Sequence, residues 1–156
     1  MTGGNVLARC ALPANSPYAA SVSNQESANG IHQGFIFGAP WIWAGNTSRD
    51  QYVGVFFGLT VTYDTVGDQN VRNWCSYLIT RLLQNLLDRL WNIVMPDGGV
   101  STTFLARPDQ QLALLLIGKH VNGGAFEKKY PAAAMAMSKP RASITSCPVG
   151  WGAIMA

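Results

Sequence analysis

Two stretches of the chain predict helices that are apolar on almost every face. Residues 47–66 read TSRDQYVGVFFGLTVTYDTV, and residues 107–122 read RPDQQLALLLIGKHVN. Each stretch opens with an Asp-Gln pair, which begins at Asp50 in the first and at Asp109 in the second. A helix without a polar face is typically buried on most of its sides. We therefore expect two buried helices in one chain.

The start of each helix carries a local signal. Ser48 and Gln51 have the spacing of a capping box, in which the serine hydroxyl and the glutamine side chain satisfy each other's backbone N–H groups. Asp50 then falls in the first turn, where the helix dipole favours a negative charge. Pro108 opens the second stretch, and proline is favoured in the first turn of a helix. We expect helices that begin near Ser48 and Pro108.

A long one-sided helix is predicted between them, over residues 69–94. Its apolar positions recur at steps of three and four residues. They are Val71, Trp74, Cys75, Leu78, Ile79, Leu82, Leu83, Leu86, Leu90, Trp91 and Val94. The sequence PDGG at residues 96–99 stops this helix.

The order of these helices predicts how they lie in space. A single intervening helix returns the chain, so the helices that begin near Ser48 and Pro108 lie side by side and point the same way. Gly54 and Gly58 form a GxxxG motif, which we interpret as a site of close helix packing. The chain contains no apolar run of the roughly 20 residues that a membrane span needs.

We expect one domain with three parts. Residues 1–45 are rich in aromatic residues, but proline and glycine break every periodic pattern, so this lead is predicted to be irregular. Residues 46–137 form the helical hairpin core, with a poorly patterned last helix over residues 126–137. Residues 138–156 are predicted to be an irregular tail.

Composition limits the possible partners. Apolar residues make up 48% of the chain and charged residues only 12%, about half the usual charged content of a soluble domain. So much uncharged surface predicts a homo-oligomer or a complex with a larger chain. The net charge of +3 is not gathered into a basic stripe, which argues against nucleic acid. No signal peptide is visible, so the protein is cytoplasmic if Met1 is the true start.

No metal or cofactor is expected. The three cysteines and two histidines are dispersed and form no ligand spacing, and no phosphate-binding or dinucleotide-binding motif is present.

The chain resembles the (α/α) toroid, or six-hairpin glycosidase-like, group over about residues 41–130, and is most similar to its uncharacterised bacterial members. In that fold, buried inner helices alternate with one-sided outer helices. The resemblance is carried by residues 47–52 (TSRDQY), Tyr63-Asp64, Trp91-x-Ile93, Pro96-Asp97-Gly98 and residues 107–111 (RPDQQ). It implies a mainly α fold of helical hairpins, incomplete here because a closed toroid needs more hairpins than this chain supplies.

Members of that group process carbohydrates as hydrolases, lyases and epimerases, with acidic and aromatic residues at one mouth of the barrel. The resemblance implies such a site at the starts of the two buried helices. Its residues would be Asp50 and Asp109 as catalytic acid and base, Arg49, Arg107 and Tyr52 to orient a sugar or uronate, and Trp41 or Trp43 as a stacking face.

Simpler interpretations stand beside this one. Asp50 and Asp109 suit the first turns of helices, and the neighbouring arginines can pair with them. Asp64 lies near a helix C-terminus, where a negative charge is unfavourable, so it needs a partner such as Arg72 or Arg107. His120 is expected on the surface at the opposite mouth. The alternative function is a noncatalytic helical module that oligomerises or associates with a larger chain, and we expect that the protein is not a stable monomer.

Overall fold

The computed structural model describes residues 5–126, of which 53% are helical and 19% lie in strands. The fold is a mixture of helices and two small antiparallel sheets, so the prediction of a mainly α, toroid-type chain is wrong. The elements in chain order are β1 (Cys10–Pro13), α1 (Ala19–Gln25), the 3-10 helix η1 (Ser27–Asn29), β2 (Ile31–Ile36), β3 (Ala39–Ala44), α2 (Arg49–Thr65), α3 (Gln69–Asp88), β4 (Asn92–Val94), β5 (Val100–Thr103), α4 (Pro108–Val121) and α5 (Gly123–Phe126). Beyond Phe126, the predicted last helix and the tail lie outside the described residues.

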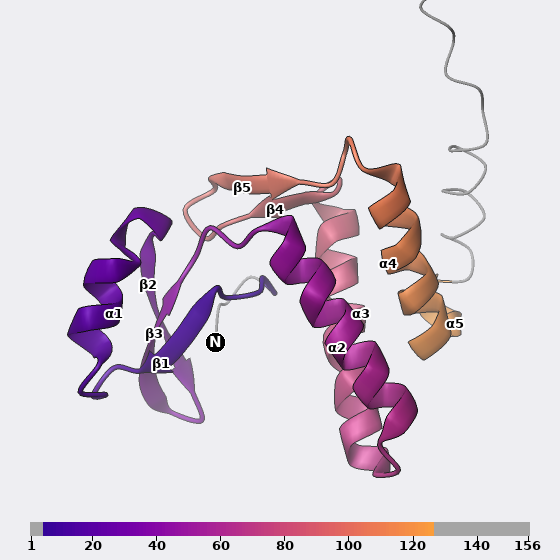
Figure 1. The fold of residues 1–156 in the computed structure, drawn as a ribbon, viewed down its shortest axis with the longest axis horizontal. Helices are drawn as coiled ribbons and strands as arrows, with labels where there is room; N and C mark the ends of the chain where they lie inside the picture. Colours follow the sequence, from indigo (N-terminus) through magenta and orange to yellow (C-terminus); the bar gives the residue numbers. More distant parts are fainter. Residues whose placement is uncertain (1–4, 127–156) are drawn as a thin grey trace, which may run out of the picture.

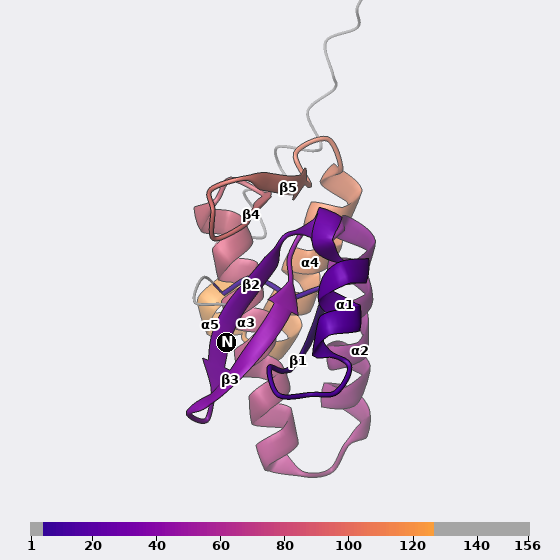
Figure 2. The ribbon, with the colours of Figure 1, turned by 90° about the vertical axis from the view of Figure 1, so that its left-hand side faces the viewer.

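The elements form two groups, and the β4–β5 hairpin lies between them in space (Figure 1). Helices α2, α3 and α4 pack together, with α5 following α4. The sheet of β1, β3 and β2 stands beside them and carries α1 on its far side (Figure 2). The β4–β5 hairpin lies across one end of the helices and reaches back toward the sheet.

The aromatic lead is not irregular, because β1, β3 and β2 form a three-stranded antiparallel sheet in that order. Ala44 of the central strand pairs with Cys10 on one side and Ile31 on the other. The prolines that suggested a loop lie where they do not break the sheet: Pro13 ends the edge strand β1, and Pro40 lies near the start of β3. Edge strands and strand starts are positions where proline is tolerated.

The turn between β2 and β3 explains why this hairpin escaped prediction. Ile36 pairs with Ala39, which leaves Phe37 and Gly38 as a two-residue loop. Both have positive φ, 49° and 81°, as a type I′ hairpin turn requires. Asparagine or aspartate usually takes the first of these positions, and phenylalanine gives no such signal.

Helix α3 ends earlier than predicted, at Asp88 rather than Val94. Leu90 and Trp91 adopt left-handed backbone conformations, with φ of 52° and 64°, which stops the helix. The next residues form β4, and the Trp91 carbonyl accepts a hydrogen bond from the Phe104 N–H at 2.8 Å. The apolar spacing at Leu90 and Trp91 continued the helical pattern, but pairing with β5 determines the structure here.

The two apolar helices begin where expected and point the same way (Figure 1). The capping box is present, since the Gln51 N–H donates to Ser48 Oγ at 3.3 Å and the Ser48 N–H donates to Gln51 Oε1 at 2.9 Å. At the other end of the pair, Asp64 of α2 meets His120 of α4. The prediction of parallel neighbours is confirmed.

The core lies between these helices and the β4–β5 hairpin. Its largest fully buried apolar side chains are Trp43, Tyr52, Phe56, Ile79, Leu83, Leu86, Ile93, Phe104, Leu114, Leu115 and Phe126. Gly118 lets α4 approach α3 closely. A Cβ at this position would overlap a methyl group of Leu83 and lie 3.0 Å from the ring of Phe126.

Substitution of Gly118 by alanine tests this close approach. Because Leu83 and Phe126 are fully buried and cannot move into solvent, Gly118→Ala should lower the free energy of unfolding by about 1–3 kcal/mol. The matched control is Gly124→Ala, where a Cβ meets no atom within 4 Å and stability should be unchanged or slightly raised. Urea denaturation followed by circular dichroism measures both. Equal stabilities for the two variants would contradict the packing.

Candidate functional site

The predicted acid and base lie at the same end of the helical group. Asp109 accepts two hydrogen bonds from Arg107, from Nε at 3.1 Å and from Nη2 at 2.9 Å. The pKa of Arg107 is raised, chiefly by this pairing and in smaller part by the negative charge of Asp50. Arg107 is therefore paired with Asp109 and also feels the charge of Asp50, and the expected pairing of an arginine with a neighbouring aspartate is confirmed for Arg107.

This arrangement does not provide a proton donor near neutral pH at Asp109. Hydrolysis of glycosides by two carboxyl groups needs one whose pKa is raised so that it stays protonated. The pKa of Asp109 is instead lowered, first of all by the hydrogen bonds from Arg107. Asp50 and Asp109 are both exposed, and neither lines the grooves described below. Their catalytic role stays a prediction.

The predicted ligand-orienting residues are mostly part of the fold. Tyr52 has no exposed surface, and its hydroxyl accepts a hydrogen bond from the Leu7 N–H at 3.1 Å. Trp43 is 2% exposed and stacks on the ring of His32 at 4.3 Å. Neither ring has a free face for a sugar in this structure. Trp41 is half-buried within β3, and Arg49 is half-buried at the start of α2.

A cluster at the opposite end of α2 was only partly foreseen. His120 Nε2 lies 2.7 Å from Asp64 Oδ1, with both side chains about half exposed. Arg72, which we expected to compensate Asp64, lies over the ring of Tyr63 at 4.8 Å. The sequence could have predicted His120 as the partner of Asp64. The register that aligns Asp50 with Asp109 also brings the last turn of α4 beside Asp64.

A polar hollow of about 470 Å³ lies between η1, the start of β2 and the β4–β5 hairpin. Its amides and hydroxyls bond to one another: Asn46 Nδ2 donates to Asn29 Oδ1 at 2.9 Å, and Ser101 Oγ donates to Asn46 Oδ1 at 3.1 Å. These contacts join the sheet to the hairpin. Within residues 5–126, no three side chains of His, Cys, Asp or Glu are gathered so that they can hold a metal ion.

The outer face of α2 is uncovered. Val53, Phe57 and Val61 are 36%, 68% and 43% exposed, although the helix was predicted to be buried on most sides. Gly54 and Gly58 lie on the same face, and a Cβ at either position would meet no atom within 4 Å. Among residues 5–126, the GxxxG motif therefore faces away from the other elements and borders open space.

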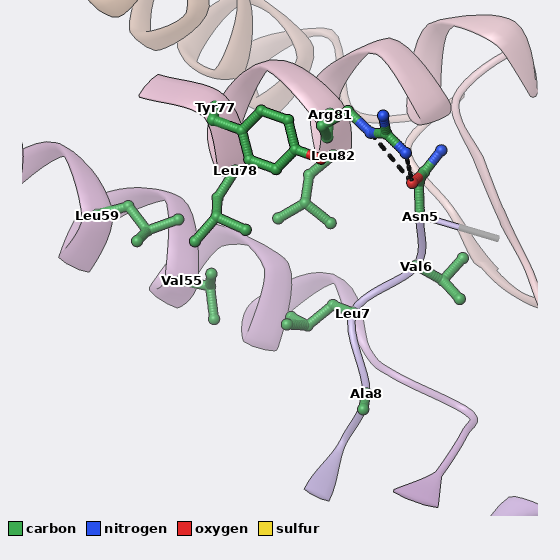
Figure 3. Close-up of a pocket in the computed structure, with 10 residues that line it drawn as sticks. All are labelled: Asn5, Val6, Leu7, Ala8, Val55, Leu59, Tyr77, Leu78, Arg81 and Leu82. Carbon is green, nitrogen blue, oxygen red and sulfur yellow. Dashed lines mark hydrogen bonds between the residues drawn. The ribbon is translucent and has the colours of Figure 1, made fainter. Parts of the chain in front are cut away.

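A second apolar surface is a groove of about 410 Å³ on the opposite side of α2 (Figure 3). Two leucines of α3, Leu78 and Leu82, face Val55 and Leu59 of α2 across it. Residues 5–8 cross one end. There Arg81 donates from Nε to Asn5 Oδ1 at 3.1 Å, and Arg81 Nη2 donates to the same oxygen.

No family model, curated protein or solved structure matches this chain. The resemblance to the toroid group therefore stays a prediction. None of the helices in residues 5–126 is long and apolar enough to cross a membrane.

Tyr52→Phe tests the structural role of the Tyr52 hydroxyl. The variant loses the acceptor for the Leu7 N–H, so the free energy of unfolding should fall by about 1–2 kcal/mol near neutral pH. Burial raises the pKa of Tyr52 above its usual value of 10.0, so the neutral phenol is the form that the fold stabilises. This stability is present below about pH 10 and is lost as the pH rises further, because only the unfolded chain ionises readily there.

The difference between the native protein and Tyr52→Phe should accordingly shrink above about pH 10. Urea denaturation at neutral and alkaline pH measures it. Tyr18→Phe is the matched control, since Tyr18 is 70% exposed and its loss should leave stability unchanged. A pH-independent difference would rule out a buried Tyr52 hydroxyl.

Proposed function

We propose that this protein is a noncatalytic association module and that the outer face of α2 packs against the same face of a second copy. The observation that carries the proposal is the uncovered stripe of Val53, Phe57 and Val61 together with the open space beside Gly54 and Gly58. Covering this stripe removes apolar surface from water, at about 25 cal/mol for each Å².

The stripe is complementary to itself. It carries one protruding aromatic ring, Phe57, beside two positions without side chains, Gly54 and Gly58. In a twofold dimer the same patch meets its own copy, so each Phe57 ring can lie over a glycine of the partner helix. Small residues at a contact also let helix axes approach closely. A second copy therefore fits this face without any other component.

Charge placement favours the same arrangement. Within residues 53–61 there is no charged side chain, whereas Asp50 and Asp64 flank the stripe at its two ends. Asp64 is paired with His120, and Asp50 lies in the field of Arg107, so neither end presents an isolated negative charge. An interface with an apolar centre and a charged rim is the usual anatomy of protein association.

A carbohydrate-processing function is supported less well. Its proposed acid, base and stacking residues do not line a common groove, and Asp109 already forms an ion pair with Arg107. The association module needs only the exposed face that the structure contains.

Light scattering of the purified protein tests the proposal. We expect a dimer at micromolar concentration, and Phe57→Ser should weaken it by at least about tenfold because a central aromatic contact is worth more than about 1.4 kcal/mol. Phe35→Ser is the matched control, because Phe35 is 69% exposed but lies on β2, away from α2. A monomeric native protein, or a dimer that is equally sensitive to both changes, would refute the proposal.

Substitution of the two glycines separates association from folding. Gly54→Ala and Gly58→Ala add methyl groups into open space in a helix, so each should raise the stability of the single chain by about 0.5–1 kcal/mol. The same methyl groups occupy the space that the partner's ring needs, so the dimer should weaken. Chemical denaturation and light scattering measure the two effects, and a variant that is stabilised and still fully dimeric would contradict close packing at the glycines.

A further inference from the structure

The groove between α2 and α3 has apolar walls on three sides. Val55 and Leu59 are one helical turn apart on α2, and Leu78 and Leu82 are one turn apart on α3. Leu7 closes the end near residues 5–8 (Figure 3). Leu78 is 41% exposed, so this surface is in contact with water when the groove is empty. The volume of about 410 Å³ falls within the range of about 300–1,000 Å³ typical of small-molecule sites.

A cation is positioned at the closed end. Two nitrogens of Arg81 donate to the single oxygen Asn5 Oδ1, and the guanidinium lies over the ring of Tyr77 at 5.6 Å. These contacts restrain a side chain that is otherwise long and mobile. In the part of the chain that the structure describes, residues 5–126, no carboxylate forms an ion pair with Arg81.

We infer that this groove binds an amphipathic carboxylate, with its hydrocarbon chain between α2 and α3 and its carboxylate on Arg81. A guanidinium has five N–H donors, and Asn5 engages only two of its nitrogens through one oxygen. The remaining donors suit a carboxylate, which guanidinium groups bind in planar, charge-assisted pairs. The apolar walls suit a chain without polar groups.

A second hollow adjoins the groove on α3. Tyr77 lines both this groove and a shallow hollow of about 290 Å³ formed with Asn70, Asn73 and Trp74. Trp74 is 63% exposed and its ring meets that of Tyr77 edge to face at 5.6 Å. Two aromatic rings of α3 therefore border the groove and the adjoining hollow.

An acyl chain fits these walls better than a peptide segment does. A peptide brings an N–H and a C=O group with every residue, and each needs a hydrogen-bond partner once it is buried. The walls formed by Val55, Leu59, Leu78 and Leu82 provide no such partners. A hydrocarbon chain has no such requirement.

The site is independent of the proposed dimer. Val55 and Leu59 lie on the α3 side of α2, whereas Val53, Phe57 and Val61 lie on its outer face. A ligand in the groove and a second copy on the outer face can therefore be tested separately.

Titration with decanoate and with decanol, followed by residue-resolved NMR, tests the inference. Decanoate should shift the signals of residues lining the groove and bind at least about tenfold more tightly than decanol, because a guanidinium binds a carboxylate in planar, charge-assisted pairs that an alcohol cannot form. Arg81→Met retains an apolar stem and should abolish this preference while leaving decanol binding unchanged. Arg81→Lys keeps the charge without the planar donors and should retain part of the preference.

Two further variants complete the design. Leu78→Asn should weaken the binding of both ligands, because it places an amide in the apolar wall. Leu78 is partly exposed, so the fold should accept a polar side chain there. Arg89→Met is the matched control, since Arg89 is an exposed arginine at the end of α3 that does not line the groove, and it should change neither affinity.

Three results would overturn the inference. They are equal binding of decanoate and decanol to the native protein, shifts that map outside the groove, and the absence of shifts at millimolar ligand. Tighter binding of an acidic, leucine-rich peptide than of decanoate would also overturn it, in favour of a peptide groove. None of these results bears on the dimer, which light scattering tests without any ligand.

Discussion

The backbone of Leu7 is held on both sides by residues at the start of α2, and the arrangement of the chain depends on this contact. Thr47, which has no exposed surface, donates from Oγ1 to the Leu7 carbonyl at 2.6 Å, and the Leu7 N–H donates to the hydroxyl of Tyr52. The Ser101 hydroxyl of the β4–β5 hairpin lies 2.8 Å from the Thr47 carbonyl and shares its one proton between this oxygen and Asn46 Oδ1. An unsatisfied polar group at such a position costs about 1–3 kcal/mol, so these bonds hold the sheet, α2 and the hairpin in one geometry.

Both apolar surfaces follow from this geometry. Residues 5–8 are fixed against α2 and α3, where they form the closed end of the groove and bring Asn5 to Arg81. The sheet is thereby placed beside the helices and does not cover the outer face of α2. With α3, α4 and residues 5–8 on its other sides, α2 keeps Val53, Phe57 and Val61 in solvent.

The charged residues have mainly structural contacts in this arrangement. Arg107 with Asp109, and His120 with Asp64, pair within or between helix ends, where they complement the helix dipoles or neutralise an unfavourable charge. Arg81 differs, because its partner is a neutral amide and it faces an apolar groove. The carboxylates that the toroid resemblance singled out, Asp50 and Asp109, line none of the grooves described above.

What the sequence determined by itself was local. The capping box at Ser48, the proline at the start of α4 and the matched Asp-Gln pairs were sufficient for the helix starts and the parallel order of α2 and α4, because each signal acts within one turn or within one hairpin. Tertiary structure decided the rest. Phe37 takes a left-handed turn conformation because the β2–β3 pairing holds it there, and Trp91 leaves the helical pattern because β4 pairs with β5. The groove needs Asn5 beside Arg81. These two residues lie far apart in the sequence, so their contact arises from packing, which no local pattern of residues encodes.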